Sequence, residues 1–189
     1  MKVSRKIGTL FVVCALALGA TMAVALSAGA DGREAKAKLR DANGAVVGVV
    51  HLSTEANGKI LVRVSASGLA AGFHGFHIHT IGICDAAGGF VSAGGHFNPG
   101  AVSHAAHAGD QPVLLVNADG TALARFATDR YMIDQLFDAD GSAFIVHAAA
   151  DNYANIPTRY SASGVPGPDA ATLSTGDAGG RSACGIIRP

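Results

Sequence analysis

The segment GFHIHTIGICDAAGGFVSAGGHFNPGAVSHAAHAGD, residues 75–110, is the part of the chain around which the rest is organised. It contains five of the eight histidines in this 189-residue sequence, and it ends on an aspartate. The six residues are His77, His79, His96, His104, His107 and Asp110. Imidazole nitrogens suit copper and zinc, and a carboxylate oxygen is a further zinc ligand. The segment therefore indicates a metal-binding region.

The pair His77 and His79 has the spacing of two residues on one face of a strand. Their side chains would project to the same side, with roots about 7 Å apart, which is close enough to hold one ion. Phe76 and Ile78 would then point into a core, and by the same parity His74 would point with them. Taken alone, the pair is equally typical of two exposed strand histidines.

The rest of the segment is typical of loops, and it supplies further ligands. Gly94-Gly95-His96 precedes Asn98-Pro99, a combination that favours tight turns. His104, His107 and Asp110 recur at every third position, a spacing that can turn three ligands toward one point. With His96 they would form a closed, four-coordinate zinc site. His147 follows the apolar run at 143–146 and is placed to bring one more ligand from a distant strand.

Five motifs together resemble the copper–zinc superoxide dismutase family, in its bacterial, exported form. They are GFHIH at 75–79, GGHFNP at 94–99, HAGD at 107–110, VHAAADN at 146–152 and GDAGGRSACGII at 176–187. The resemblance extends from about residue 36 to 187. One departure is that only two alanines separate His104 from His107, where many relatives have a longer zinc loop.

The resemblance implies a role for each matching residue. Copper would be bound by His77, His79, His96 and His147. Zinc would be bound by His96, His104, His107 and Asp110, so that His96 bridges both ions. Asp151 would link a copper histidine to a zinc histidine, and Arg181 would lie beside the open copper position. Cys84 and Cys184 would form the intrachain disulfide.

These roles imply an antioxidant oxidoreductase. Two superoxide anions would become dioxygen and hydrogen peroxide by copper redox cycling, with His96 and Arg181 taking part and a structural zinc holding His96. The main alternative is a noncatalytic protein of the same fold that buffers or delivers copper. That alternative predicts the loss of Arg181 or of one copper ligand, and all of them are present.

The remaining sequence predicts an all-β domain. Alternating residues at 36–40, 59–66 and 121–127 indicate strands, and Asn43-Gly44 and Asn57-Gly58 are hairpin signals. Residues 131–137 would be a short helical turn or a loop, and 148–180 a long loop lining the channel to copper. We expect a Greek-key β-barrel or sandwich of about eight antiparallel strands.

Residues 1–30 are interpreted as a signal peptide, and 31–189 as the dismutase domain. Lys2, Arg5 and Lys6 precede a mostly apolar run at 7–28, and Ala28-Gly29-Ala30 is similar to a cleavage site. The run is also long enough to serve as an uncleaved membrane anchor. Cys14 lies inside it and has no role of its own. Export would place the protein in the periplasm, the cell envelope or the medium, where disulfides persist.

The charge balance limits the partners. Lys and Arg total 14, as do Asp and Glu, and three of the cations belong to the leader, so the remainder is mildly acidic. No basic patch or aromatic stacking platform is evident, so we expect no nucleic acid partner. The expected partner is the superoxide anion. The sequence does not decide whether the protein forms a homodimer. A membrane would be a partner only if the leader is retained.

Overall fold

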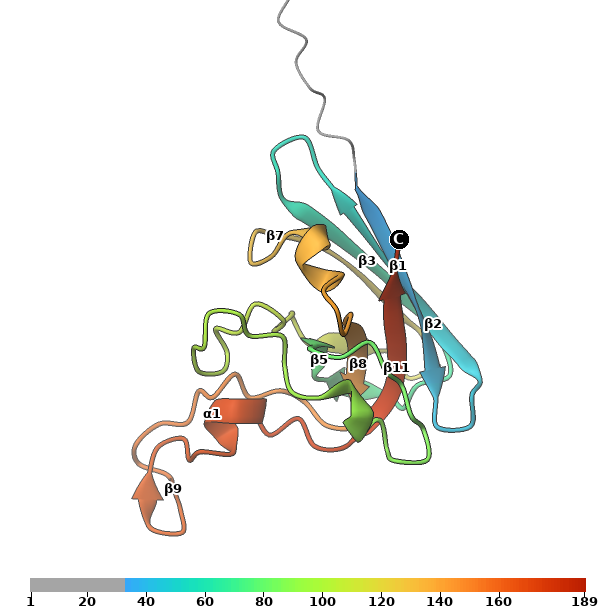
Figure 1. Cartoon of the computed structure of the whole chain (residues 1–189). Helices are drawn as coiled ribbons and strands as arrows, with labels where there is room; N and C mark the ends of the chain where they lie inside the picture. The colour runs from blue at the N-terminus through green and yellow to red at the C-terminus, as the bar shows by residue number, and fades with distance from the viewer. Residues whose placement is uncertain (1–32) are drawn as a thin grey trace, which may run out of the picture.

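A computed structural model describes residues 33–189, so the predicted leader, with Cys14, lies outside the described residues. One antiparallel sheet dominates the fold (Figure 1). In spatial order its strands are β5 (Phe76–His79), β8 (Ala143–His147), β11 (Arg181–Arg188), β1 (Glu34–Asp41), β2 (Val46–Thr54), β3 (Ile60–Ala66) and β7 (Ala122–Thr128). Strands that follow each other in the sequence are not always neighbours in the sheet. The last strand, β11, lies between β8 and the first strand, β1.

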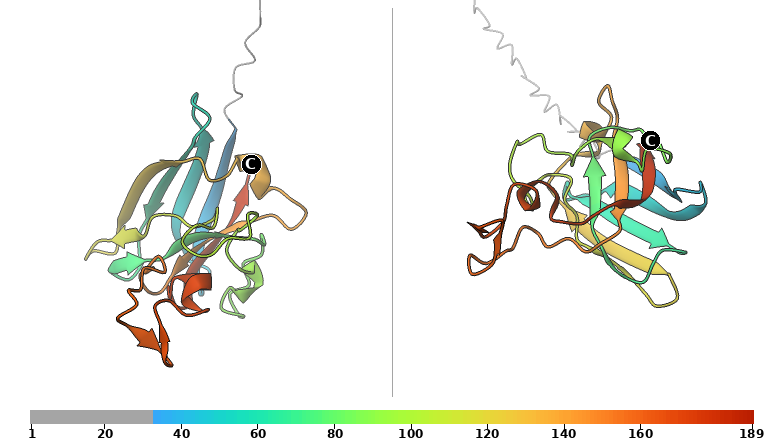
Figure 2. Two further views of the ribbon diagram at one scale, coloured as in Figure 1. Left: turned by 90° about the vertical axis from the view of Figure 1, so that its left-hand side faces the viewer. Right: turned by 90° about the horizontal axis from the view of Figure 1, so that it is seen from below.

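Smaller elements complete the fold. Two-stranded sheets join β4 (Gly72–His74) to β6 (Leu114–Val116), and β9 (Ser161–Ala162) to β10 (Val165–Pro166). The helical turns are η1 (Val91–Ala93), η2 (Ile133–Leu136) and α1 (Thr172–Thr175). Figure 2 shows that the main sheet curls on itself and that the long loops gather at one end. The predicted all-β fold is confirmed, and seven of its strands form the main sheet. Within residues 33–189, no helix is long and apolar enough to cross a membrane.

The alternation of residue types explains which side of the sheet each residue faces. In β1, exposed and buried residues alternate from Glu34 to Arg40, as the sequence pattern predicts. Both predicted hairpin glycines, Gly44 and Gly58, adopt positive φ of 80° and 81°, which few other residues tolerate. The inward faces of the strands form one core that includes Phe76, Ile78 and Phe144. On the outward side of β1, β2, β3 and β7, residues such as Lys36, His51, Arg63 and Arg125 are exposed.

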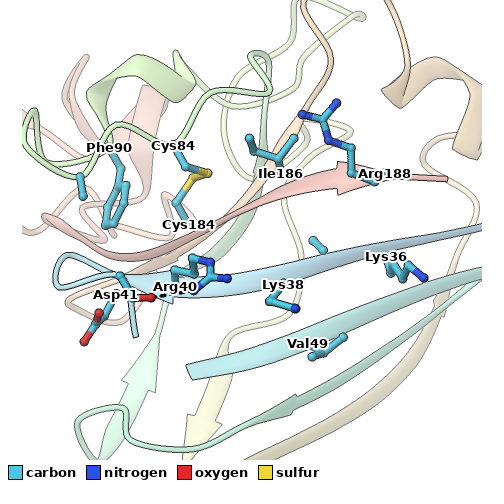
Figure 3. Close-up of a pocket in the computed structure, with 13 residues that line it drawn as sticks. Lys36, Lys38, Arg40, Asp41, Val49, Cys84, Phe90, Cys184, Ile186 and Arg188 are labelled. Carbon is cyan, nitrogen blue, oxygen red and sulfur yellow. Dashed lines mark hydrogen bonds between the residues drawn. A yellow bond between two sulfur atoms is a disulfide. The ribbon is translucent and has the colours of Figure 1, made fainter. Parts of the chain in front are cut away.

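A disulfide joins the loop after β5 to the last strand. Cys84 and Cys184 are 100 residues apart in sequence, and their Cα atoms are 5.7 Å apart (Figure 3). A small buried cluster with Phe90, Ala93 and Ile145 surrounds Cys184. The bridge therefore fixes the loop that carries η1 against β11, the strand that begins with Arg181.

Candidate metal centre

Strand β5 places the first two histidines as the sequence predicts. Phe76 and Ile78 belong to the core, while His77 and His79 face the opposite side. All four residues are buried, because β5 pairs with β8 on one side and bridges to the loop residues His96 and Asp110 on the other. His74 is not among the clustered ligands. Its Nδ1 lies 2.7 Å from the His147 carbonyl oxygen and its Nε2 lies 2.8 Å from that of Ala70.

Four histidines converge on one point. Ligand atoms of His77, His79, His96 and His147 all lie within 4.8 Å of one another. His147 reaches the cluster because it ends β8, directly beside β5. The ring centroids of His77 and His96 are 4.0 Å apart, and those of His77 and His147 are 4.7 Å apart. The sequence prediction that these four residues share a site is thus consistent with their positions.

Hydrogen bonds outside the cluster leave one nitrogen of each ring free to bind an ion. His77 Nε2 donates to Asp151 Oδ2 at 2.7 Å, and its Nδ1 is buried without a hydrogen-bond partner. His79 Nδ1 and His147 Nδ1 donate to the Gly94 and Gly179 carbonyls, at 2.9 and 3.1 Å. The Nε2 atoms of His79 and His147 then face each other at 3.4 Å as two acceptors. Acceptors pointing at one spot without a donor fit a metal ion.

Burial keeps the rings of His77, His79 and His147 neutral, which is the protonation state that binds metals. It lowers the pKa of His79 to about 2 and that of His147 to about 3, although each ring donates to a carbonyl. Burial also lowers the pKa of His77, against the opposing effect of its hydrogen bond to Asp151. The cluster is therefore ready to bind a cation at neutral pH.

A second cluster shares His96 with the first. Its members are His96, His104, His107 and Asp110, with ligand atoms within 4.8 Å of one another. Asp110 Oδ1 lies 2.8 Å from His96 Nδ1 and 3.3 Å from His107 Nδ1, and the two Nδ1 atoms are 3.2 Å apart. Asp110 Oδ2 is 3.1 Å from His104 Nδ1 without hydrogen-bond geometry, so that nitrogen also lacks a partner. Three nitrogens and one oxygen fit a tetrahedral zinc site.

Asp151 connects the two clusters from outside. Its Oδ2 accepts from His77 Nε2, and its Oδ1 accepts from His104 Nε2 at 2.8 Å. Gly176 packs directly on this link with φ of 61°. A Cβ added at Gly176 would collide with the Asp151 carboxylate and the His104 ring. The long loop at 148–180 therefore fixes the positions of the two histidine clusters relative to each other. This contribution is separate from its expected place along the channel to copper.

The buried charges around His104 favour a charged imidazole when no cation is bound. Burial opposes its protonation, but the carboxylates of Asp110 and Asp151 raise its pKa to about 9. Burial would raise the pKa of both carboxyl groups as well, yet the histidines beside them hold those pKa values well below the usual range. A cation at the second cluster would replace the proton of His104.

Arg181 lies beside the four-histidine cluster. It pairs with His147 across β11 and β8, and its guanidinium donates to the Phe90 and Gly94 carbonyls, at 2.5 and 2.6 Å. The Gly94 carbonyl also accepts from His79. Partial burial lowers the pKa of Arg181. An arginine remains charged in proteins, so a fixed cation stands next to the cluster.

Arg130 supports the loop at 104–110, and no sequence motif predicts this contact. Its Nη1 donates to the carbonyl oxygens of Ala105, His107 and Asp110, at 3.1, 3.2 and 3.4 Å. These contacts tie down the short segment between His104 and Asp110. No sequence signal marked Arg130, because it lies 20 residues or more from each partner.

Two histidine clusters that share one ring, held by a curled β-sheet, define a protein with a two-metal centre. The chain belongs to the copper/zinc superoxide dismutase family, whose family model matches residues 46–187. The superoxide dismutases [Cu-Zn] of Mycobacterium tuberculosis and Mycobacterium bovis are each 44% identical over 146 residues. Each alignment covers 70% of this chain, and the chain spans 61% of the length of those relatives.

Solved structures show the same fold. A SOD-like protein from Bacillus subtilis is 31% identical with a TM-score of 0.63, covering 80% of this chain and 96% of its own. The clock protein EA4 is 27% identical with a TM-score of 0.65, covering 82% and 94%. Family membership implies copper and zinc as the metals, and the two clusters fit them.

Proposed function

We propose that this chain is a superoxide dismutase, which converts two superoxide anions into dioxygen and hydrogen peroxide. One observation supports this most strongly: the two ligand clusters share His96, and Arg181 donates to the same Gly94 carbonyl as His79. A protein that only stores metal needs ligands, but it does not need a cation fixed beside them. Membership of the family supports the same activity.

The ligand assignment belongs to this proposal. Copper would be held by His77, His79, His96 and His147, and zinc by His96, His104, His107 and Asp110. The buried Nδ1 atoms of His77 and His104, which have no hydrogen-bond partner, support it. Asp151 would orient both sites by fixing Nε2 as the protonated nitrogen of His77 and His104.

The side chains would divide the work as follows. When bound, copper supplies one-electron redox chemistry and zinc supplies a fixed positive charge. Arg181 attracts the superoxide anion and holds it by charge-assisted hydrogen bonds. His96 Nδ1 faces Asp110 and His107, which leaves Nε2 on the side of the other cluster. That Nε2 would take a proton in one half of the cycle and give it to the departing peroxide in the other.

Metal loading tests the proposal. Purified protein is stripped and then loaded with copper alone, with zinc alone, or with both, and dismutase activity is measured after each treatment. We expect copper to be required and the pair of metals to be most active. Tight copper binding without dismutase activity in the doubly loaded protein would instead identify a copper-buffering protein of the same fold.

We also propose that the protein is exported by cleavage of residues 1–30. The Cys84–Cys184 disulfide supports this, because such bonds persist outside the cytosol. N-terminal sequencing of the protein recovered from fractionated cells tests it. A retained leader would instead make a membrane surface a partner. Sedimentation of the purified protein would decide between a monomer and a homodimer.

A further inference from the structure

The outward face of the main sheet carries a row of basic side chains that runs across the strands. The register pairs Arg188 with Lys36, Lys36 with His51, His51 with Arg63, and Arg63 with Arg125. The five residues come from five adjacent strands, β11, β1, β2, β3 and β7. Residues directly opposite each other on neighbouring strands project from the same face of the sheet. Neighbouring strands lie about 4.8 Å apart, so a row across five strands is about 19 Å long. We call these five residues the basic row.

All five residues of the basic row are exposed. Within residues 33–189, none of its four Lys or Arg side chains lies within salt-bridge distance of a carboxylate. The described chain as a whole is acidic. Of the 14 Lys and Arg residues in the sequence, Lys2, Arg5 and Lys6 lie outside residues 33–189, which leaves 11. Of the 14 Asp and Glu residues, only Asp31 lies outside, which leaves 13. The basic row therefore contradicts the sequence expectation of no basic patch.

The surroundings extend the positive surface at the end of the row formed by β11 and β1, and they add uncharged contacts at the end formed by β3 and β7. Lys38 and Arg40 follow Lys36 along β1 and line a groove beside the disulfide, with Arg188 on the neighbouring strand (Figure 3). In the next row, Lys38 pairs with Val49, Val49 with Ser65, and Ser65 with Leu123, which is 81% exposed. One acid, Glu34, lies two residues before Lys36 on the same face.

The arrangement has a cost to the free protein. Like charges directly opposite on neighbouring strands repel each other, and the basic row has two such pairs, Lys36 with Arg188 and Arg63 with Arg125. A bound anion would remove this repulsion. The shape of the sheet favours some classes of anion over others. The basic row crosses the strands, which is the direction in which the sheet curls. A flat membrane would touch only part of a convex row, whereas a flexible chain can follow all of it.

We propose that the basic row binds a flexible anionic polysaccharide laid across the strands. Acidic groups along the polymer would contact Arg188, Lys36, Arg63 and Arg125 in turn. Its sugar rings would contact the hydroxyl and apolar side chains of Ser65 and Leu123. The row contains no Phe, Tyr or Trp on which bases could stack, so it does not favour single-stranded nucleic acid. This surface is separate from the metal centre and does not depend on the proposed dismutase activity.

Binding of labelled dextran sulfate to the metal-loaded protein tests the proposal, with neutral dextran of equal length as the control polymer. The double variant Arg63→Gln/Arg125→Gln removes two contacts. Its affinity should fall about ten-fold at low salt, and the slope of log affinity against log salt should shrink by about two. The matched double variant Arg33→Gln/Arg159→Gln loses the same charge away from this face, because Arg33 contacts Asp134 and Arg159 lies in the 148–180 loop, so it should bind like wild type.

Thermal melting provides a second measurement that does not depend on the binding signal. Without polymer, Arg63→Gln/Arg125→Gln should melt no lower than wild type, because it relieves a like-charge pair. Dextran sulfate should raise the melting temperature of wild type and raise that of the variant much less. Equal binding by the two double variants, binding of neutral dextran as tight as that of dextran sulfate, or a preference for phosphatidylglycerol vesicles over dextran sulfate would each overturn the proposal.

Discussion

His77 and His104 are joined through one carboxylate, that of Asp151, which accepts from both Nε2 atoms at 2.7 and 2.8 Å. The two histidines belong to different metal clusters, so a single buried side chain sets the tautomer of a ring in each. All three residues have side chains that are fully buried. A substitution at Asp151 should therefore weaken metal binding at both clusters.

Asp151→Asn should weaken metal binding without abolishing the fold. An asparagine oxygen can accept from one ring, but its NH2 group cannot accept from the other. Loss of such an outer partner typically lowers metal affinity about 10–100-fold. Competition with a zinc chelator measures the effect. Asp129→Asn, at an exposed position, is the control, and equal zinc affinity in the two variants would show that Asp151 does not support the site.

His96→Ala should damage both metal sites, whereas His107→Ala should affect zinc alone. The reason is that His96 belongs to both ligand clusters and His107 to only one. Metal analysis of the purified variants, together with copper absorption spectra, distinguishes the two results. Full zinc content and a normal copper spectrum in His96→Ala would exclude a shared ligand.

Arg181→Ala should leave metal content and fold intact but slow the reaction with superoxide. Charged hydrogen bonds contribute roughly 1.5–3 kcal/mol each, and about 1.4 kcal/mol corresponds to a ten-fold change in rate. A fall of about ten-fold or more in the second-order rate constant is expected. Pulse radiolysis of metal-matched samples at several ionic strengths measures it.

Arg181→Lys is the matched variant for this experiment. It keeps the charge and loses the planar fork that now contacts the Phe90 and Gly94 carbonyls, so part of the rate should remain. If Arg181→Ala reacted as fast as wild type with the same salt dependence, Arg181 would be a structural cation without a role in the reaction.

Removal of the disulfide should lower stability and activity together. In the chain-entropy model a closed loop of this length contributes up to ~4–5 kcal/mol. Activity should fall as well, because the bridge holds the η1 loop, whose Phe90 carbonyl accepts from Arg181. The double variant Cys84→Ser/Cys184→Ser avoids a free thiol, and wild type with and without reductant is its control. An unchanged melting temperature under oxidising conditions would contradict this role.

The metal-free protein should be most stable near pH 6.5. Below that pH the unfolded chain protonates His79 and His147 while the folded chain does not, so stability falls toward pH 3, by up to about 2.7 kcal/mol per pH unit for the two groups. Above pH 6.5 the unfolded chain loses the proton of His104 while the folded chain keeps it. The stability that this proton contributes is therefore lost as the pH rises through about 9, the raised pKa of His104. Urea titrations across this range, compared with the metal-loaded protein, test both limbs. A stability that did not change between pH 4 and 9 would contradict the prediction.

Much of the candidate site could be predicted from the sequence, because its residues lie in short motifs. A period of two put His77 and His79 on one face of β5, and the fold confirms that Phe76 and Ile78 face the core. The alternation in β1 and the glycine turns at Gly44 and Gly58 likewise follow from local chemistry. Such features depend on neighbouring residues, so the sequence is enough to predict them.

Other features exist only because distant segments meet. Arg130 reaches the loop at 104–110 and Gly176 packs against Asp151 through contacts between loops, which no local pattern encodes. The basic row is the clearest case, since Lys36, Arg63 and Arg188 are scattered along a chain without a basic run. Strand register aligned them, and register is determined by which faces of all the strands can be buried together. The sequence by itself determined which chemical groups were available for each site, whereas the pairing of the strands decided which of them became neighbours.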